Sequence, residues 1–144
     1  MIQSPRGAFF VCLLALLLAS CWSDEDKVSE SQKYYFLESL KQVEAGGMRL
    51  RSSNLNRQEM NEALAMLDQG LRLAFEVDRE FLDQLDLRLG KNFERYFVKG
   101  VENYRLGIEA GDEQQQREGL RLLARWSEFW HAEQAAIRAR LEPG

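Results

Sequence analysis

The chain has 144 residues and a formal net charge of −4, with 19 basic and 23 acidic residues mixed along its length. This balance argues against nucleic-acid binding, which needs a clustered basic face. The length is sufficient for one domain with its own core, and the only two prolines, Pro5 and Pro143, lie near the ends of a composition rich in helix-forming residues.

The first twenty-one residues have the layout of a secretory signal. A short polar stretch carries one positive charge, Arg6, and an unbroken apolar run follows from Ala8 to Leu18. This run is shorter than the roughly 20 apolar residues that a membrane-spanning helix needs. A positive start, a short apolar run and small residues before a cleavage point are the marks of a removable signal peptide, predicted here for residues 1–20.

The end of the run, Leu18-Ala19-Ser20-Cys21, resembles the lipobox of bacterial lipoproteins. The resemblance covers residues 1–21. It implies that a diacylglyceryl group with acyl chains such as palmitate is joined to Cys21, that the signal is cut before it, and that the new amino terminus is acylated. Two or three chains form a stable membrane anchor, because each buried CH₂ contributes about 0.8 kcal/mol. The alternatives are an ordinary signal peptide that contains a cysteine and a signal anchor that is never cut.

The same resemblance carries an expected location. In lipoproteins of enteric bacteria, an aspartate directly after the cysteine favours retention in the inner membrane, and Trp22 stands in that place here. We therefore expect a lipid-anchored protein of the outer membrane that faces the periplasm, with the inner membrane as the alternative. With Cys12 in the signal and Cys21 lipidated, no thiol is left for a disulfide. Residues 21–27 are predicted to be a polar tether and residues 28–144 a helical domain.

Two helices are predicted in the first half of that domain. The first covers about residues 29–51, and Gly46 and Gly47 weaken its pattern. The second begins at a capping box formed by Asn56 and Glu59. Its apolar residues recur at three- and four-residue steps up to Leu89, which predicts one helix of roughly 50 Å. The apolar residues on which these two predictions depend are Phe36, Leu37, Leu40, Val43, Met60, Leu64, Leu67, Leu71, Phe75, Leu82, Leu85 and Leu89.

Three polar or small residues affect where the second helix is predicted to break or end and what its buried face holds. Gly70 can mark a kink or a break, and Gly90 is predicted to end the helix. Asp78 falls on the buried stripe, where a polar residue is usually a boundary residue paired with an arginine and occasionally a binding device.

Two further helices are predicted in the second half. Residues 91–109 carry an aromatic face, and Gly100 and Gly107 would let a neighbouring helix approach closely. Gly111 suits a left-handed helix end, and Asp112 suits the N-cap of a last helix that runs to about Leu141. The residues predicted to line the buried sides of these helices are Phe93, Tyr96, Phe97, Val101, Tyr104 and Ile108, then Leu120, Leu123, Trp126, Trp130, Ile137 and Leu141.

The pattern as a whole predicts an all-α fold. Four amphipathic helices with short connections favour an up-down-up-down four-helix bundle after the signal peptide and tether. Stacked helical hairpins, as in a repeat protein, are the alternative, although the chain shows no period near 34 residues.

Candidate chemical groups are few. Glu128 and the single histidine, His131, have the E-x-x-H spacing of di-iron bundles, which need two such motifs. We therefore expect His131 on a helix surface, with no metal and no cofactor. A haem held by His131 and one of Met48, Met60 or Met66 is an alternative. Without a nucleophile elbow or a phosphate-binding loop, we expect a protein that is not an enzyme.

The aromatic residues near the end of the chain are the most informative candidates for binding. Tyr104, Trp126 and Trp130 are candidate partner-binding residues because tryptophan and tyrosine are enriched at interaction hot spots. The simpler interpretation is that these rings only fill the core. The main hypothesis is a lipid-anchored, non-enzymatic adaptor that binds an envelope protein. Pilotins, small helical lipoproteins that carry secretin subunits, are similar in architecture alone. The alternative is a carrier of a small apolar ligand or a haem within the bundle.

Overall fold

The computed structural model describes residues 22–142, with side chains from Glu30 onward. The predicted signal peptide and the predicted lipidation of Cys21 both lie outside the described residues. The chain divides after Ser31 into two units. Apart from the start of the first described helix, everything below concerns the unit that begins at Gln32.

The described part of the chain is all-helical, which confirms the predicted fold class. No strand occurs between residues 22 and 142. The elements are α2 (Trp22–Leu50), α3 (Arg57–Phe75), α4 (Arg79–Leu85), α5 (Leu89–Asn92), the π-helix η1 (Phe93–Val98), α6 (Lys99–Ala110) and α7 (Glu113–Leu141). Because α5, η1 and α6 follow one another directly, they form one continuous helical stretch.

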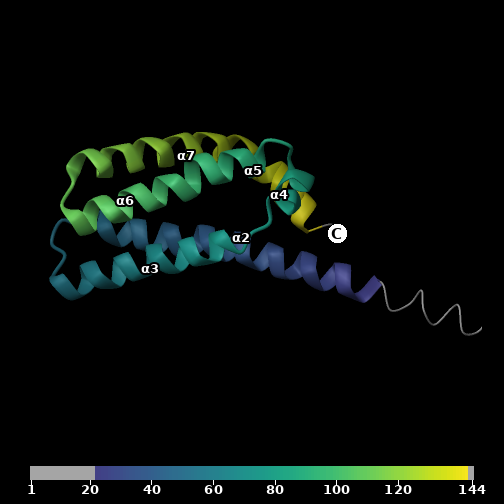
Figure 1. Cartoon of the computed structure of the whole chain (residues 1–144), viewed down its shortest axis with the longest axis horizontal. Helices are drawn as coiled ribbons and strands as arrows, with labels where there is room; N and C mark the ends of the chain where they lie inside the picture. Colours follow the sequence, from purple (N-terminus) through teal and green to yellow (C-terminus); the bar gives the residue numbers. More distant parts are fainter. Residues whose placement is uncertain (1–21, 143–144) are drawn as a thin grey trace, which may run out of the picture. The chain divides into compact units, whose positions relative to one another are not determined.

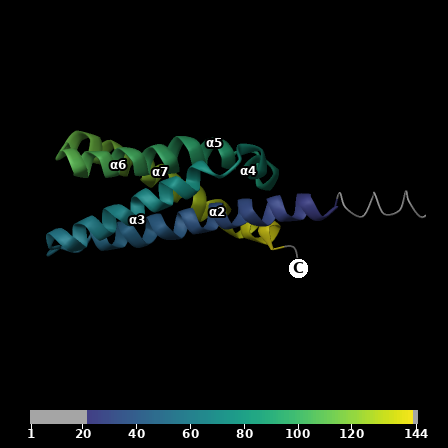
Figure 2. The same cartoon turned by 60° about the horizontal axis from the view of Figure 1, so that its bottom comes forward.

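The long helices of this unit lie in two pairs, α2 beside α3 and α6 beside α7 (Figure 1, Figure 2). Small residues bring each pair together. A Cβ atom on Gly70 of α3 would lie 2.6 Å from Cγ2 of Val43 in α2, and one on Gly107 of α6 would lie 2.6 Å from the backbone nitrogen of Gln116 in α7. A Cβ atom on Gly100 of α6 would likewise lie against the side chain of Leu123 in α7. The predicted close approach at Gly100 and Gly107 is therefore confirmed.

Aromatic rings connect the two pairs. Phe36 of α2 is fully buried, and its ring lies 5.4 Å from Phe93 of η1 and 5.8 Å from Trp130 of α7. Phe93 in turn stacks on Phe97 at 4.9 Å and contacts Trp126 at 5.8 Å. Edge-to-face and stacked pairs of this kind stabilise a core beyond the area that they bury.

The single long helix predicted from Asn56 to Leu89 is wrong, because α3 ends at Phe75 and α4 begins at Arg79. The side chain of Gln32 stabilises the break. Its Oε1 accepts a hydrogen bond from the backbone N–H of Asp78 at 2.6 Å, and its Nε2 donates to the carbonyl of Glu76 at 3.0 Å. Asp78 is therefore an exposed residue at the N-terminus of α4, not part of a buried stripe.

Two predicted helix ends also need correction, whereas the predicted end of the first helix near residue 51 agrees with α2. α2 begins at Trp22, so residues 22–27, predicted as a tether, are helical, and the helix continues through Gly46 and Gly47 to Leu50. Gly90 ends no helix: it lies within α5, and its N–H donates to the carboxylate of Asp83 at 3.2 Å.

The predicted caps agree with the structure. Asn56 and Glu59 form the complete capping box of α3. Gly111 has φ of 66°, the left-handed conformation that favours glycine, and Asp112 accepts hydrogen bonds from the first turn of α7. On α7 itself, Leu122 is buried whereas Leu120, predicted to be buried, is 50% exposed. None of the helices between residues 22 and 142 has the length and apolar character needed to cross a membrane.

A candidate binding groove between α2, α6 and α7

A groove of about 1000 Å³ opens along one side of α2. Its walls are one face of α2, the helical stretch from η1 to α6, and α7, and α3 contributes one residue. The lining residues are Leu40, Val43, Glu44, Gly47 and Met48 of α2, Arg51 directly after α2, Leu67 of α3, Phe97, Val101 and Tyr104 of η1 and α6, and Leu120, Leu123, Ala124, Trp126, Ser127, Trp130, Gln134 and Arg138 of α7.

The inner part of the groove is apolar. Leu67, Phe97 and Val101 are buried residues of the core that also line it. Nearer the opening, Met48 is 60% exposed and Leu120 is 50% exposed, and both line the groove. An apolar hollow whose rim holds exposed large apolar residues is a candidate site for a partner or a ligand.

The three predicted partner-binding residues all line this groove. Trp126 is buried and stacks on Trp130 at 5.6 Å with the ring planes 15° apart. Tyr104 is partly buried, and this burial raises the pKa of its phenol above the ordinary value although the nearby charge of Arg51 acts in the opposite direction. Core packing and groove lining therefore do not exclude one another: Trp126 does both.

A π-helix contributes to one wall. Phe97 lies in η1 and faces both the core and the groove. π-helical turns are rare and are frequent at functional sites. The sequence holds no signal for this turn, because Phe93 and Phe97 are four residues apart and fit an ordinary helix equally well.

The α2 side of the groove was missed by sequence reasoning. Gly47, together with Ala124 and Ser127 across from it, leaves room because these side chains are small or absent. Charged residues also line the groove: Glu44 on α2, Arg51 directly after α2, and Arg138 on α7. The glycine was the available signal, since a glycine inside a strongly helical pattern often marks a close approach.

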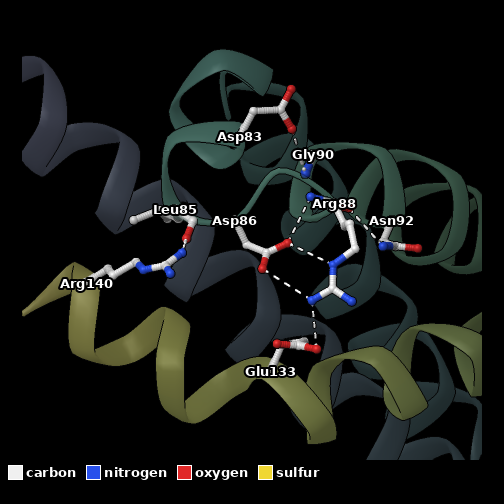
Figure 3. Close-up of polar contacts among 8 residues, drawn as sticks. All are labelled: Asp83, Leu85, Asp86, Arg88, Gly90, Asn92, Glu133 and Arg140. Atoms are coloured by element: carbon white, nitrogen blue, oxygen red, sulfur yellow. Dashed lines mark hydrogen bonds and ion pairs between the residues drawn. The ribbon is translucent and has the colours of Figure 1, made fainter.

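A separate cluster of polar contacts ties the connection between α4 and α5 to α7 (Figure 3). The guanidinium of Arg88 pairs with Asp86 at 3.3 Å and with Glu133 of α7 at 2.7 Å. Asp86 also accepts the backbone N–H of Arg88 at 2.8 Å, and Arg140 of α7 donates to the carbonyl of Leu85. We interpret this cluster as structural, because each polar side chain drawn makes at least one contact with another residue of the cluster.

The cluster predicts a dependence of stability on pH. Burial opposes the ionisation of Asp86, but hydrogen bonds from Arg88 and the charges of Arg88 and Arg140 outweigh it and lower the pKa of Asp86 below the ordinary value of 3.8. A carboxyl group with a lowered pKa in the folded state stabilises the fold above its unfolded pKa, and this contribution disappears as the pH falls through the folded pKa.

We therefore expect Asp86→Asn to lower the melting temperature at neutral pH, and to lower it less as the pH falls below the ordinary value of 3.8 and through the lowered pKa of folded Asp86. Melting curves of the two proteins at a series of pH values measure this difference. A difference in melting temperature that stays constant from neutral to acidic pH would contradict the assignment.

The remaining candidates for chemistry are not brought together. His131 is exposed, as expected, and does not line the groove. Glu128 pairs with Arg125 at 3.3 Å. Among the described residues, no group of three or more histidine, cysteine, aspartate or glutamate side chains could hold a metal ion.

Comparisons of the chain with protein-family models, with curated proteins and with solved structures find no match.

Proposed function

We propose that this protein is a lipid-anchored, non-enzymatic adaptor of the bacterial envelope that binds a helix of a partner protein in the groove between α2, α6 and α7. The lipobox-like sequence that ends at Cys21 supports an anchor facing the periplasm, with the outer membrane as the expected location. The resemblance to pilotins is one of architecture alone, and no residue is carried over from them.

The observation that carries this proposal is the groove itself. Its apolar surface, with charged residues among the apolar ones at the rim, has the features by which a groove binds the apolar face of an amphipathic helix. Phe36 contacts Trp130 at one end, and Arg51 lies near Tyr104 at the other. On this side the lining runs from Leu40 of α2 to Arg51, directly after the helix, a rise of about 16 Å or about three turns of a partner helix.

We also propose that α2, α3, the stretch from α5 to α6, and α7 form an up-down-up-down bundle. In such a bundle the groove lies between α2 and α7, where these two helices do not pack fully against each other. Seams between the helices of a bundle are common places for ligand sites.

The volume of the groove favours one second candidate. About 1000 Å³ is at the upper end of the roughly 300–1,000 Å³ of small-molecule pockets, which supports a carrier of an apolar ligand. A haem is less well supported, because His131 does not line the groove and Met48 is the one groove residue named as an axial ligand. Native mass spectrometry of the protein purified from its own membranes separates the candidates: a bound small molecule of defined mass favours the carrier.

Photocrosslinking in intact cells tests the adaptor function. A photoreactive amino acid at Ser127, an exposed residue that lines the groove, is expected to crosslink to one envelope protein. The same group at Gln69, an exposed residue of α3 outside the groove, is the control and is expected to give no such product. Mass spectrometry then identifies the crosslinked segment. A segment that is not an amphipathic helix, or equal crosslinking from both positions, would contradict the proposal.

A further inference from the structure

We infer that the partner helix approaches α2 closely at Gly47 and carries an acidic residue near each end of its docked segment with a basic residue between them. This inference rests on the proposed function and specifies the chemistry of the partner. It is carried by a glycine that no contact within the described chain explains and by the order of charges along the groove.

Gly47 differs from its neighbour in what surrounds it. A Cβ atom on Gly46 would lie 2.9 Å from the carbonyl oxygen of Ala63, so the packing of α3 explains that glycine. A Cβ atom on Gly47 would meet nothing within 4 Å. Glycine in a helix interior is unfavourable relative to alanine, and at Gly47 the described chain offers no compensating contact. A second backbone that approaches the groove at this point would supply one.

The charges on the rim alternate in sign along the groove. The guanidinium of Arg138 lies 5.7 Å from the centre of the Trp130 ring, which marks the end of the groove beside Phe36. From that end, Glu44 follows on α2, and Arg51 lies directly after α2 and near Tyr104 at the opposite end. The order along the groove is therefore positive, negative, positive.

Neither Arg51 nor Arg138 is neutralised by an ion pair within the described part of the chain, although Arg138 lies over the Trp130 ring. Seven of the twelve exposed arginines between residues 30 and 142 form a salt bridge, as Arg72 does with Asp68. Arg51 and Arg138 form no salt bridge with any residue between 30 and 142, although Glu142 follows Arg138 by four positions. An arginine that lies over an aromatic ring, as Arg138 lies over Trp130, is well suited to bind a carboxylate of the partner while it continues to cover the ring.

Two designed peptides test the inference. Each has about four to five helical turns and the same leucine face. The first has glutamate near both ends and lysine between them, spaced to match Arg138, Glu44 and Arg51, and the second has every charge reversed. Both are labelled with a fluorophore and titrated against the purified full chain in lipid nanodiscs, with empty nanodiscs as the blank.

The first peptide is expected to bind at least about tenfold more tightly at low ionic strength, and the difference should shrink as salt screens the rim. Because the formal net charge of the chain is −4, nonspecific electrostatic attraction between chain and peptide would favour the second peptide instead. The double variant Arg51→Glu/Arg138→Glu is expected to reverse the preference. The control Arg57→Glu/Arg95→Glu changes the net charge equally, away from the groove, and is expected to leave the preference unchanged.

The outcomes separate the two proposals. If both peptides bind equally and Arg51→Glu/Arg138→Glu changes nothing, the inference about the partner's charges is overturned while binding of a helix stands. If neither peptide binds above the blank, the proposed helix-binding function is overturned as well. Circular dichroism of each variant shows that the helices are intact when its binding is compared.

Discussion

Replacing Phe36 with alanine is expected to reduce the free energy of unfolding by about 3–5 kcal/mol, which is the usual cost of removing a large aromatic side chain from a core. Phe36 is fully buried and joins α2 to both η1 and α7 through the rings of Phe93 and Trp130. Its loss leaves a cavity where the two pairs of helices meet. Urea denaturation followed by far-ultraviolet circular dichroism measures the change.

Tyr34 provides a matched control on the same helix. It is also aromatic, but its side chain is 58% exposed. Tyr34→Ala is therefore expected to change the free energy of unfolding by no more than about 0.5 kcal/mol. Equal effects of the two substitutions would mean that α2 does not pack on the rest of the unit through Phe36.

Replacing Gly47 with tryptophan is expected to abolish partner binding without loss of stability. The new ring extends into the groove, where a Cβ atom at this position would meet nothing within 4 Å. The substitution also removes a glycine from a helix interior, which is favourable by a few tenths of a kcal/mol. We expect an unchanged or slightly higher melting temperature and at least about a hundredfold loss of affinity for the partner segment, since a close helix approach no longer fits.

The adjacent glycine is the structural control. Gly46→Ala places a methyl group 2.9 Å from the carbonyl oxygen of Ala63 and is expected to destabilise the protein by about 1–3 kcal/mol through overpacking between α2 and α3. Thermal melting of the two glycine variants distinguishes them. If Gly47→Trp melts as low as Gly46→Ala does, the groove is closed in solution and the account fails.

The helical pattern and the caps were predictable from sequence because both depend on local interactions. Asn56 with Glu59, and Gly111 with Asp112, use hydrogen bonds to backbone groups a few residues away, and these are visible in the sequence. The all-α fold class follows from the spacing of apolar residues, which is also local.

The break between α3 and α4 was not predictable in the same way. The apolar spacing continues through Phe75 and Leu82, yet Phe75 is 64% exposed and Leu82 is buried. The side chain that satisfies the backbone at the break, Gln32, lies more than forty residues earlier in the chain. A tertiary contact therefore decides a feature that local spacing contradicts.

The candidate site was predicted in part. The sequence offers Tyr104, Trp126 and Trp130 as candidates for partner binding, with core filling as the simpler interpretation, and all three line one groove. The α2 side depends on which way Gly47 faces relative to Gly46, and a weakened helical pattern cannot distinguish these two glycines. The π turn at Phe97 changes no spacing that a sequence shows.

The most direct test of the account is the yield of the crosslink from position 127 in intact cells that also carry Gly47→Trp. With the photoreactive group in place and the protein present at wild-type level, we predict that the product seen with Gly47 is lost when tryptophan fills the groove. The same product in undiminished yield, from a variant that folds normally, would contradict the claim that the partner lies in this groove.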